Sequence, residues 1–286
     1  MDNVCAYLDI LGFKNHIKED PLAASNLLSE YTSVIGNLGV GGKYKSFNYF
    51  LPFSDGIFIQ SNDPSKFVFD LSKFLVESFL KNGFGNIIVE RDNHSPVVDE
   101  TKYTELPGRR PLLFRGGVAY GDSVPKRVSC IYDNKLEYKH SLIGEAVVEA
   151  VALEGKGRGP RVFCSGKFYE SLDDNAKRLV INQFDDEEGK NYEIIWPASF
   201  FTENGFYESY YEFDRLFISS RLSWKAFNHK QYGINYYNFL KLIVLSGLHF
   251  WGGSPENLAS VKRYIEPGLT KACLQNKRDD LFMGFK

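Results

Sequence analysis

The sequence predicts an α+β fold of the α/β sandwich kind, with helices stacked on one face of a mainly antiparallel sheet. Over residues 1–197, short segments with strand patterns alternate with segments whose apolar residues have helical spacing. Two pairs of expected strands are neighbours in sequence and form hairpins, which favours antiparallel pairing. Residues 198–286 have mainly helical patterns. We therefore expect a domain at 1–197 and a mostly helical C-terminal extension at 198–286, packed on that domain or on a dimer interface.

Composition and charge narrow the class of protein. The 286 residues are 43% apolar and 24% charged, as in a soluble globular protein, and a net charge of -2 gives no field that would hold a nucleic acid. The four cysteines are far apart and form no CxxC, which argues against a disulfide framework or a zinc site. The apolar stretch Phe239–Trp251 is shorter than the roughly 20 residues that cross a bilayer. We expect a cytoplasmic protein without a membrane span.

The expected elements of the first half follow from local patterns. They are a buried strand at Val4–Asp9, a helix at Pro21–Gly36, a strand at Ser46–Phe53, a tight turn at Ser54-Asp55-Gly56 into Ile57–Ile59, and a helix that opens at Asp63. In the second strand, alternation places Phe47, Tyr49, Leu51 and Phe53 on one face.

The second half of the expected domain continues the alternation. Its elements are a polar loop at Glu90–Arg110, a strand at Pro111–Tyr120, a hairpin at Val128–Leu142, a helix at Gly144–Glu154, a strand at Arg161–Cys164, a helix at Lys167–Val180, an acidic loop from Asp185 to Gly189 and a strand at Tyr192–Trp196.

Candidate chemistry lies at the ends of the first strands. Asp9 ends the first strand and precedes Ile10-Leu11-Gly12-Phe13, where Gly12 allows close backbone approach and a helix start would present free N–H groups. Asp55 lies in the hairpin turn. If the strands pair, two carboxylates meet at one sheet edge, and such oxygen ligands suit Mg²⁺ or Mn²⁺. The alternative is that both aspartates are ordinary turn or cap residues.

Four segments together extend this pattern. They are Asp9-Ile10-Leu11-Gly12-Phe13, Phe53-Ser54-Asp55-Gly56, the RGGVAYG segment that opens at Arg115, and the helix at Gly144–Glu154. Their order and spacing resemble the catalytic domain of class III nucleotidyl cyclases, over about residues 1–197. The resemblance implies the fold of that family and a lyase that cyclises a nucleoside triphosphate.

The resemblance also implies roles for individual residues. Asp9 and Asp55 would hold two Mn²⁺ or Mg²⁺ ions, with Ile10 as a further metal ligand through its backbone. Arg115 would contact the triphosphate, Gly12 and Phe13 would bind substrate, and Lys190 would reach the phosphates from a late turn. The family's sites lie between two such domains, so the chain would form a homodimer with composite active sites.

Two departures from the family pattern point to the substrate. Where purine cyclases carry a transition-state asparagine and arginine, this sequence has Val148 and Ala152. Arg158 or Arg161 could substitute, metal ions could suffice, or the protein is catalytically silent; both arginines could equally be solvated turn charges.

The second departure concerns the base. Leu51 stands where many purine cyclases carry a charged base-reading residue, and Tyr49 precedes it. Either the two limit a small pocket suited to a pyrimidine, or they belong to a core face. The combination resembles the bacterial pyrimidine cyclases of the Pycsar antiphage defence system, which implies UTP as substrate, cyclic UMP as messenger and a separate cyclic-nucleotide-responsive effector. Cytidylate cyclisation is the first alternative and a purine cyclase the second.

Overall fold

The computed structural model describes residues 2–39, 42–81, 91–92, 95–96, 111–133, 135–186, 189–201, 206–251 and parts of 254–283. It has the expected α+β fold. The main sheet has seven strands in the order β10-β11-β9-β6-β1-β3-β2, and its pairs are antiparallel apart from β6 with β9. These strands are β1 (Asp2–Ile10), β2 (Tyr49–Phe53), β3 (Gly56–Ser61), β6 (Phe114–Asp122), β9 (Val162–Cys164), β10 (Val180–Asp186) and β11 (Gly189–Ile194).

One face of the sheet is covered by the larger hydrophobic core. The elements on this side include α2 (Pro21–Val34), its π-helical continuation η1 (Ile35–Gly39) and α3 (Pro64–Lys81). Alternate residues of β1, such as Leu8 and Ile10, pack there with Phe67, Phe74 and Phe114. A short helix, α1 (Phe13–Glu19), connects β1 to α2 and begins directly after Gly12, where a helix start was expected.

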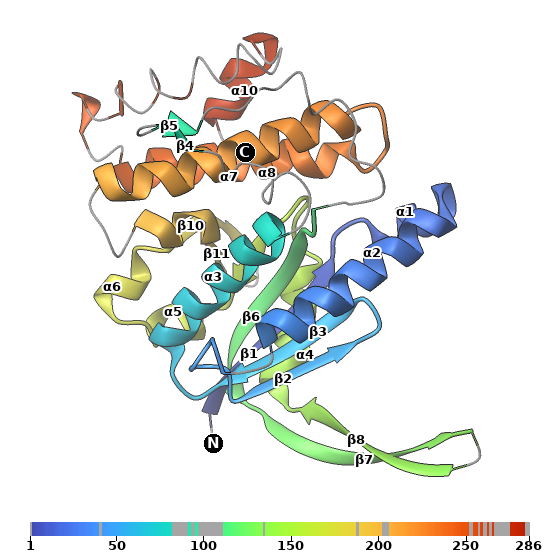
Figure 1. Cartoon of the computed structure of the whole chain (residues 1–286). Coiled ribbons are helices and arrows are strands. Elements are labelled where there is room, and N and C mark those ends of the chain that lie inside the picture. The colour runs from blue at the N-terminus through green and yellow to red at the C-terminus, as the bar shows by residue number, and fades with distance from the viewer. Residues whose placement is uncertain are drawn as a thin grey trace.

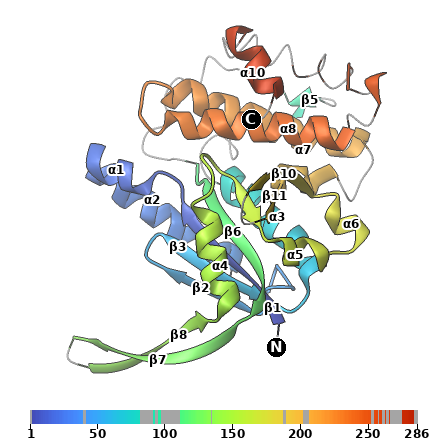
Figure 2. The same ribbon diagram turned by 180° about the vertical axis from the view of Figure 1, so that it is seen from behind.

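The opposite face carries α4 (Glu145–Glu154), which lies behind the sheet in Figure 1 and in front of it in Figure 2. Ala146, Ala150 and Leu153 form a smaller core cluster there with Cys5 of β1. The helix lies so close that a Cβ on Gly117 of β6 would be 2.0 Å from the carbonyl oxygen of Ala150. The expectation that helices cover one face is therefore wrong: both faces are apolar, and both are covered.

Two strands leave the main sheet as an arm. β7 (Val124–Tyr132) and β8 (Lys135–Ile143) pair only with each other within the described chain and project from the body in both views (Figures 1 and 2). The sequence predicted this hairpin, with a later start. Another short hairpin, β4 (Arg91–Asp92) with β5 (Ser95–Pro96), lies in the stretch predicted to be a polar loop, whose other residues up to 110 fall outside the described part.

The C-terminal helices lie at the end of the sheet toward which β1 runs from the N-terminus (Figure 1). They are α7 (Phe206–Phe227) and α8 (Gly233–Trp251), preceded by the 3₁₀ helix η4 (Trp196–Phe201); η5 (Gln275–Lys277) and α10 (Arg278–Met283) follow. Phe239 of α8 stacks on Trp196, with 4.9 Å between the ring centroids, and meets Phe79 of α3 edge-on, with 4.6 Å between the centroids. The larger core therefore continues across residue 197, and the division there stays a prediction.

Three local expectations were wrong. Phe47 lies before β2 and stacks on Phe50 in the larger core, opposite the face of Tyr49 and Leu51, because the backbone bends at Asn48 and this interrupts the alternation. The helix expected at Lys167–Val180 is two short helices, α5 (Gly166–Glu170) and α6 (Asp174–Lys177), and the acidic loop is part of the β10–β11 hairpin. Ser165 and Asp173 each cap a new helix through a side-chain hydrogen bond, which is why one helix becomes two.

Candidate active site

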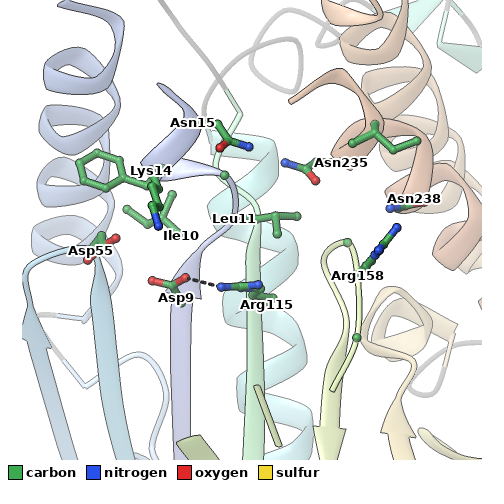
Figure 3. A pocket seen from close by; sticks show the side chains of 15 residues that line it. Asp9, Ile10, Leu11, Lys14, Asn15, Asp55, Arg115, Arg158, Asn235 and Asn238 are labelled. Atoms are coloured by element: carbon green, nitrogen blue, oxygen red, sulfur yellow. Dashed lines mark hydrogen bonds and ion pairs between the residues drawn. The ribbon is translucent and has the colours of Figure 1, made fainter. Parts of the chain in front are cut away.

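The two aspartates predicted to bind metal lie together where β1 meets the β2–β3 hairpin. Asp9 is paired with Gly56 in the β1–β3 register, and Asp55 occupies the two-residue turn just before Gly56. The N–H of Ile10 donates to the carbonyl oxygen of Asp55 at 3.0 Å, which fixes the turn against the end of β1. The hairpin prediction is confirmed, and antiparallel pairing brings both carboxylates to one edge (Figure 3).

Arg115 lies beside Asp9 on the next strand. The β1–β6 register pairs the two residues, and Nη2 of Arg115 donates to Oδ2 of Asp9 at 3.3 Å. The guanidinium also forms an ion pair with Glu154 at the end of α4. Arg115 therefore bridges Asp9 and Glu154 in this structure.

The environment of Asp9 disfavours its charge. Burial is the largest cause, and the nearby Asp55 carboxylate is the next; together they raise the pKa of Asp9 to about 6 despite the opposing effect of Arg115. A carboxylate pair with this repulsion is stabilised by a divalent cation, since the cation neutralises both charges. The donor set of Asp9, Asp55 and the backbone at Ile10 consists of oxygen atoms and fits Mg²⁺ or Mn²⁺.

The loop after β1 differs in part from the predicted nest of free amides. The N–H of Leu11 donates to the carbonyl oxygen of Leu113 at 2.8 Å, and that of Ile10 is used by Asp55, so neither is available to a ligand. Gly12 has a φ of 81°, a left-handed conformation that favours glycine. A Cβ at Gly12 would also lie 2.8 Å from Nδ2 of Asn235 on α8. The loop is therefore held between the sheet and the C-terminal helix.

A cavity of about 530 Å³ opens at this end of the sheet. Among the predicted residues, Asp9, Ile10, Gly12, Phe13, Asp55 and Arg115 line it. Other polar residues on its wall are Lys14 and Asn15 of α1, Arg158 from the loop between α4 and β9, and Asn235 and Asn238 of α8 (Figure 3). One chain thus brings two carboxylates, three cationic side chains and three carboxamides to a single cavity.

Of the predicted substrate residues, Tyr49 and Leu51 do not line this cavity, and the side chain of Lys190 lies outside the described part of the chain. In the register of the β10–β11 hairpin Lys190 is opposite Asp185, and its strand β11 lies three strands from β1 in the sheet order. Leu51 of the edge strand β2 packs in the smaller core cluster, as the core alternative holds. Tyr49 is 37% exposed on the same face of β2. The base-side roles of Tyr49 and Leu51, and the phosphate role of Lys190, stay predictions.

The two candidate replacements for the missing transition-state asparagine and arginine, Arg158 and Arg161, differ in whether they reach the cavity. Arg161 is not available, because its guanidinium makes hydrogen bonds of 2.9 and 2.7 Å to the fully buried carboxylate of Glu193. Arg158 lines the cavity on the same chain as Asp9. Val148 and Ala152 are exposed on the outer face of α4.

Sequence reasoning missed three residues of the site. Glu154 was predicted only as the last residue of a helix. It forms an ion pair with Arg115 because α4 packs closely on Gly117, and the sequence does not show that contact. Asn235 and Asn238 were passed over because the C-terminal region contained no recognisable chemistry. Their spacing of three residues within an aromatic helix was the available signal, because it places both amides on one face.

Two further observations bear on metals and membranes. Across the described residues, no three His, Cys, Asp or Glu side chains are grouped so that they could hold a metal, so the donor set is the aspartate pair with backbone oxygen. Within the same residues, no helix combines the length and apolar character needed to cross a bilayer.

The chain matches no protein-family model and no curated protein. Solved structures to which it is similar include the guanylyl cyclase Cya2, with 14% identity, a TM-score of 0.45, and coverage of 68% of this chain and 92% of that chain. For the adenylate cyclases from Trypanosoma brucei the values are 17%, 0.42, 68% and 87%. For the guanylate cyclase domain of RhGC from Catenaria anguillulae in complex with GTP they are 13%, 0.42, 68% and 95%. At such low identities and TM-scores these likenesses carry no argument about function.

Proposed function

We propose that the protein is a nucleotidyl cyclase that converts UTP to 3′,5′-cyclic UMP and pyrophosphate. The observation that carries this proposal is that Asp9 and Asp55 lie close together on the wall of a cavity that Lys14, Arg115 and Arg158 also line. Paired carboxylates beside several cations suit a substrate that is a metal-bound polyphosphate. The four sequence motifs shared with class III cyclases favour cyclisation over other reactions of such substrates.

In the proposed reaction, the ribose 3′-hydroxyl attacks the α-phosphorus. The new O3′–P bond closes the ring while the bond from that phosphorus to the bridging oxygen of pyrophosphate breaks, and the hydroxyl proton passes to water. Two Mn²⁺ or Mg²⁺ ions held by Asp9 and Asp55 would acidify the hydroxyl and neutralise the departing pyrophosphate.

The chain's own residues position these groups. Arg115 holds the Asp9 carboxylate through its 3.3 Å hydrogen bond and is itself held by Glu154. Lys14 and Arg158 line the cavity without an ion-pair partner among the described residues, so their charge is available to phosphate oxygens. Positioning and charge are what such a displacement requires of the protein.

The choice of a pyrimidine rests on the strand β2. Tyr49 and Leu51 share the α4 face of the sheet with Asp9, and neither offers the charged group that purine cyclases use at this place. Tyr49→Ala is expected to relax discrimination against ATP and GTP, or to lower UTP turnover. Tyr49→Phe, which keeps the ring, is the matched control. Unchanged selectivity in Tyr49→Ala would mean that Tyr49 and Leu51 belong to a core face and do not limit a base pocket.

Incubation of the purified protein with each of the four nucleoside triphosphates and Mn²⁺, followed by mass spectrometry, tests the function. Cyclic UMP is expected as the main product, and Asp55→Asn provides the inactive control. Cyclic CMP would select the cytidylate alternative, and a purine product the second one. No product from any nucleotide would leave a catalytically silent nucleotide-binding protein.

We also propose a homodimer whose partner covers the α4 face, and a separate effector that responds to the product as a second messenger in antiphage defence. Val148 on α4 is 71% exposed and Ile131 on the β7–β8 arm 78% exposed, which is unfavourable for a face left in water. Light scattering should give twice the chain mass, and Val148→Glu should reduce it. Leu22→Glu, a change at an equally exposed position on α2, is the control.

A further inference from the structure

The C-terminal helix α8 forms one wall of the cavity that holds the aspartate pair. Ile234, Asn235 and Asn238 line the cavity from this helix, while Tyr236, Phe239 and Leu240 are buried in the larger core. The burial of these residues fixes the rotation of α8 about its axis, and the two asparagines therefore face the cavity (Figure 3).

Two loops of the site are packed directly on these asparagines. A Cβ at Gly12 would lie 2.8 Å from Nδ2 of Asn235, and a Cβ at Gly159 would lie 2.5 Å from Cβ of Asn238. Both glycines have positive φ values, 81° and 88°. In addition, His16 of α1 is buried with its ring 4.0 Å from that of Tyr232, just before α8. The helix therefore holds the β1–α1 loop and the loop of Arg158 in one arrangement.

The polar side chains on this wall are hydrogen-bond donors that the described part of the chain leaves unused. Neither side-chain amide of Asn235 and Asn238 has a hydrogen-bond partner among the described residues, and Arg158 has no ion-pair partner there. The first turn of α8, a helix of 19 residues, contributes Asn235 and the positive end of the helix dipole. Carboxamide N–H groups, a guanidinium and a helix N-terminus all favour an anion.

We propose that Asn235, Asn238 and Arg158 bind the outer phosphates of the nucleoside triphosphate. The C-terminal extension is then part of the substrate site, and it acts on the same chain as Asp9. Arg115 is engaged with Asp9 and Glu154, so this wall supplies the polyphosphate contacts that Arg115 cannot make alone. The inference takes the nucleotide from the proposed function, but its polyphosphate chemistry follows from the wall itself.

The test measures binding of inorganic tripolyphosphate in excess Mn²⁺ by titration calorimetry, alongside product analysis with UTP. The double variant Asn235→Ala/Asn238→Ala should bind tripolyphosphate about thirtyfold more weakly, because two hydrogen bonds to a charged ligand are lost. It keeps the Cβ of Asn238 that packs on Gly159, so the fold should persist. Arg158→Ala, at an exposed position, should weaken binding on its own.

Asn228→Ala is the matched control, because Asn228 is exposed in the α7–α8 connection and does not line the cavity. Unchanged tripolyphosphate affinity in the double variant, or no binding by the wild-type chain, would overturn the inference. Tripolyphosphate binding that depends on the asparagines, with no cyclic product, would support the phosphate-binding role of the α8 wall and overturn the proposed function. If the double variant forms cyclic product with unchanged kinetics, the proposed function is supported and the phosphate-binding role of the two asparagines is overturned.

Discussion

Two arginine–carboxylate pairs on the same sheet have opposite characters. Arg161 makes two hydrogen bonds of 2.9 and 2.7 Å to Glu193, and their side chains are 10% and 0% exposed. Arg115 makes one hydrogen bond of 3.3 Å to Asp9, and these side chains are 37% and 18% exposed. The first pair is sealed and internally satisfied. The second has a further carboxylate, Asp55, beside it and opens to a cavity.

The difference teaches which features mark a site. Both pairs join an arginine to an acidic residue, so the type of charge does not separate them. What separates them is unsatisfied charge: Glu193 has its bidentate partner, whereas Asp9 and Asp55 repel each other. A site that awaits a ligand keeps such an imbalance, while a structural pair removes it.

The largest expected effect comes from removing one charge of the aspartate pair. Asp9→Asn or Asp55→Asn should lower cyclic nucleotide formation by about a thousandfold or more, roughly 4 kcal/mol in the barrier, since metal binding is lost. The amide is nearly isosteric, so circular dichroism should be unchanged. An active Asp55→Asn enzyme would contradict the metal assignment.

The sealed pair should respond in the opposite way. Glu193→Gln leaves the Arg161 guanidinium largely buried without a carboxylate, and we expect a loss of about 3 kcal/mol in the free energy of unfolding. Urea denaturation measures it. Activity per folded molecule should stay close to wild type, and a large specific loss of turnover would show that the two pairs are coupled.

Arg115→Met sharpens the contrast with a change at the open pair. Activity should fall about a hundredfold, because Asp9 loses the group that holds it and the cavity loses a cation. Stability should fall by less than in Glu193→Gln, since water reaches the freed carboxylates of Asp9 and Glu154. Steady-state kinetics and urea denaturation of the same preparation give both numbers, and a stability loss larger than that of Glu193→Gln would reverse the comparison.

The smallest expected effect is a pH dependence of stability. The folded-state pKa of Asp9, about 6, lies above its unfolded value near 3.8, so the folded state holds this proton more tightly. The contribution of this proton to the free energy of unfolding is thus present below the unfolded pKa and is lost as the pH rises through 6. It amounts to about 1–2 kcal/mol at this partly exposed site.

Denaturation at pH 4.5 and 7.5, without metal, measures this effect as a difference between the wild-type chain and Asp9→Asn. The variant lacks the titrating group, so the wild type should lose stability relative to it on going to the higher pH. Mn²⁺ at pH 7.5 should restore the wild type and leave the variant unchanged. Identical pH profiles would mean that neither burial nor Asp55 raises the pKa of Asp9 in the folded state.

The sequence by itself determined the mixed character of the fold and the aspartate pair. Periodicity located β1, the two hairpins and α4, because residues on opposite faces of an element differ in hydrophobicity over a few positions. The Ser54-Asp55 turn fixed the register of β2 and β3, and with it the place of Asp55. Each of these features depends on local chemistry.

Only the tertiary structure decided how the rest of the site is assembled. Arg158 and Arg161 are three residues apart and look alike in sequence, yet one faces the cavity and the other is sealed by Glu193. Asn235 lies more than 200 positions from Gly12 but touches its loop. Such contacts depend on how α8 packs against the sheet, and that is set by the combined burial of many side chains, which no local pattern encodes.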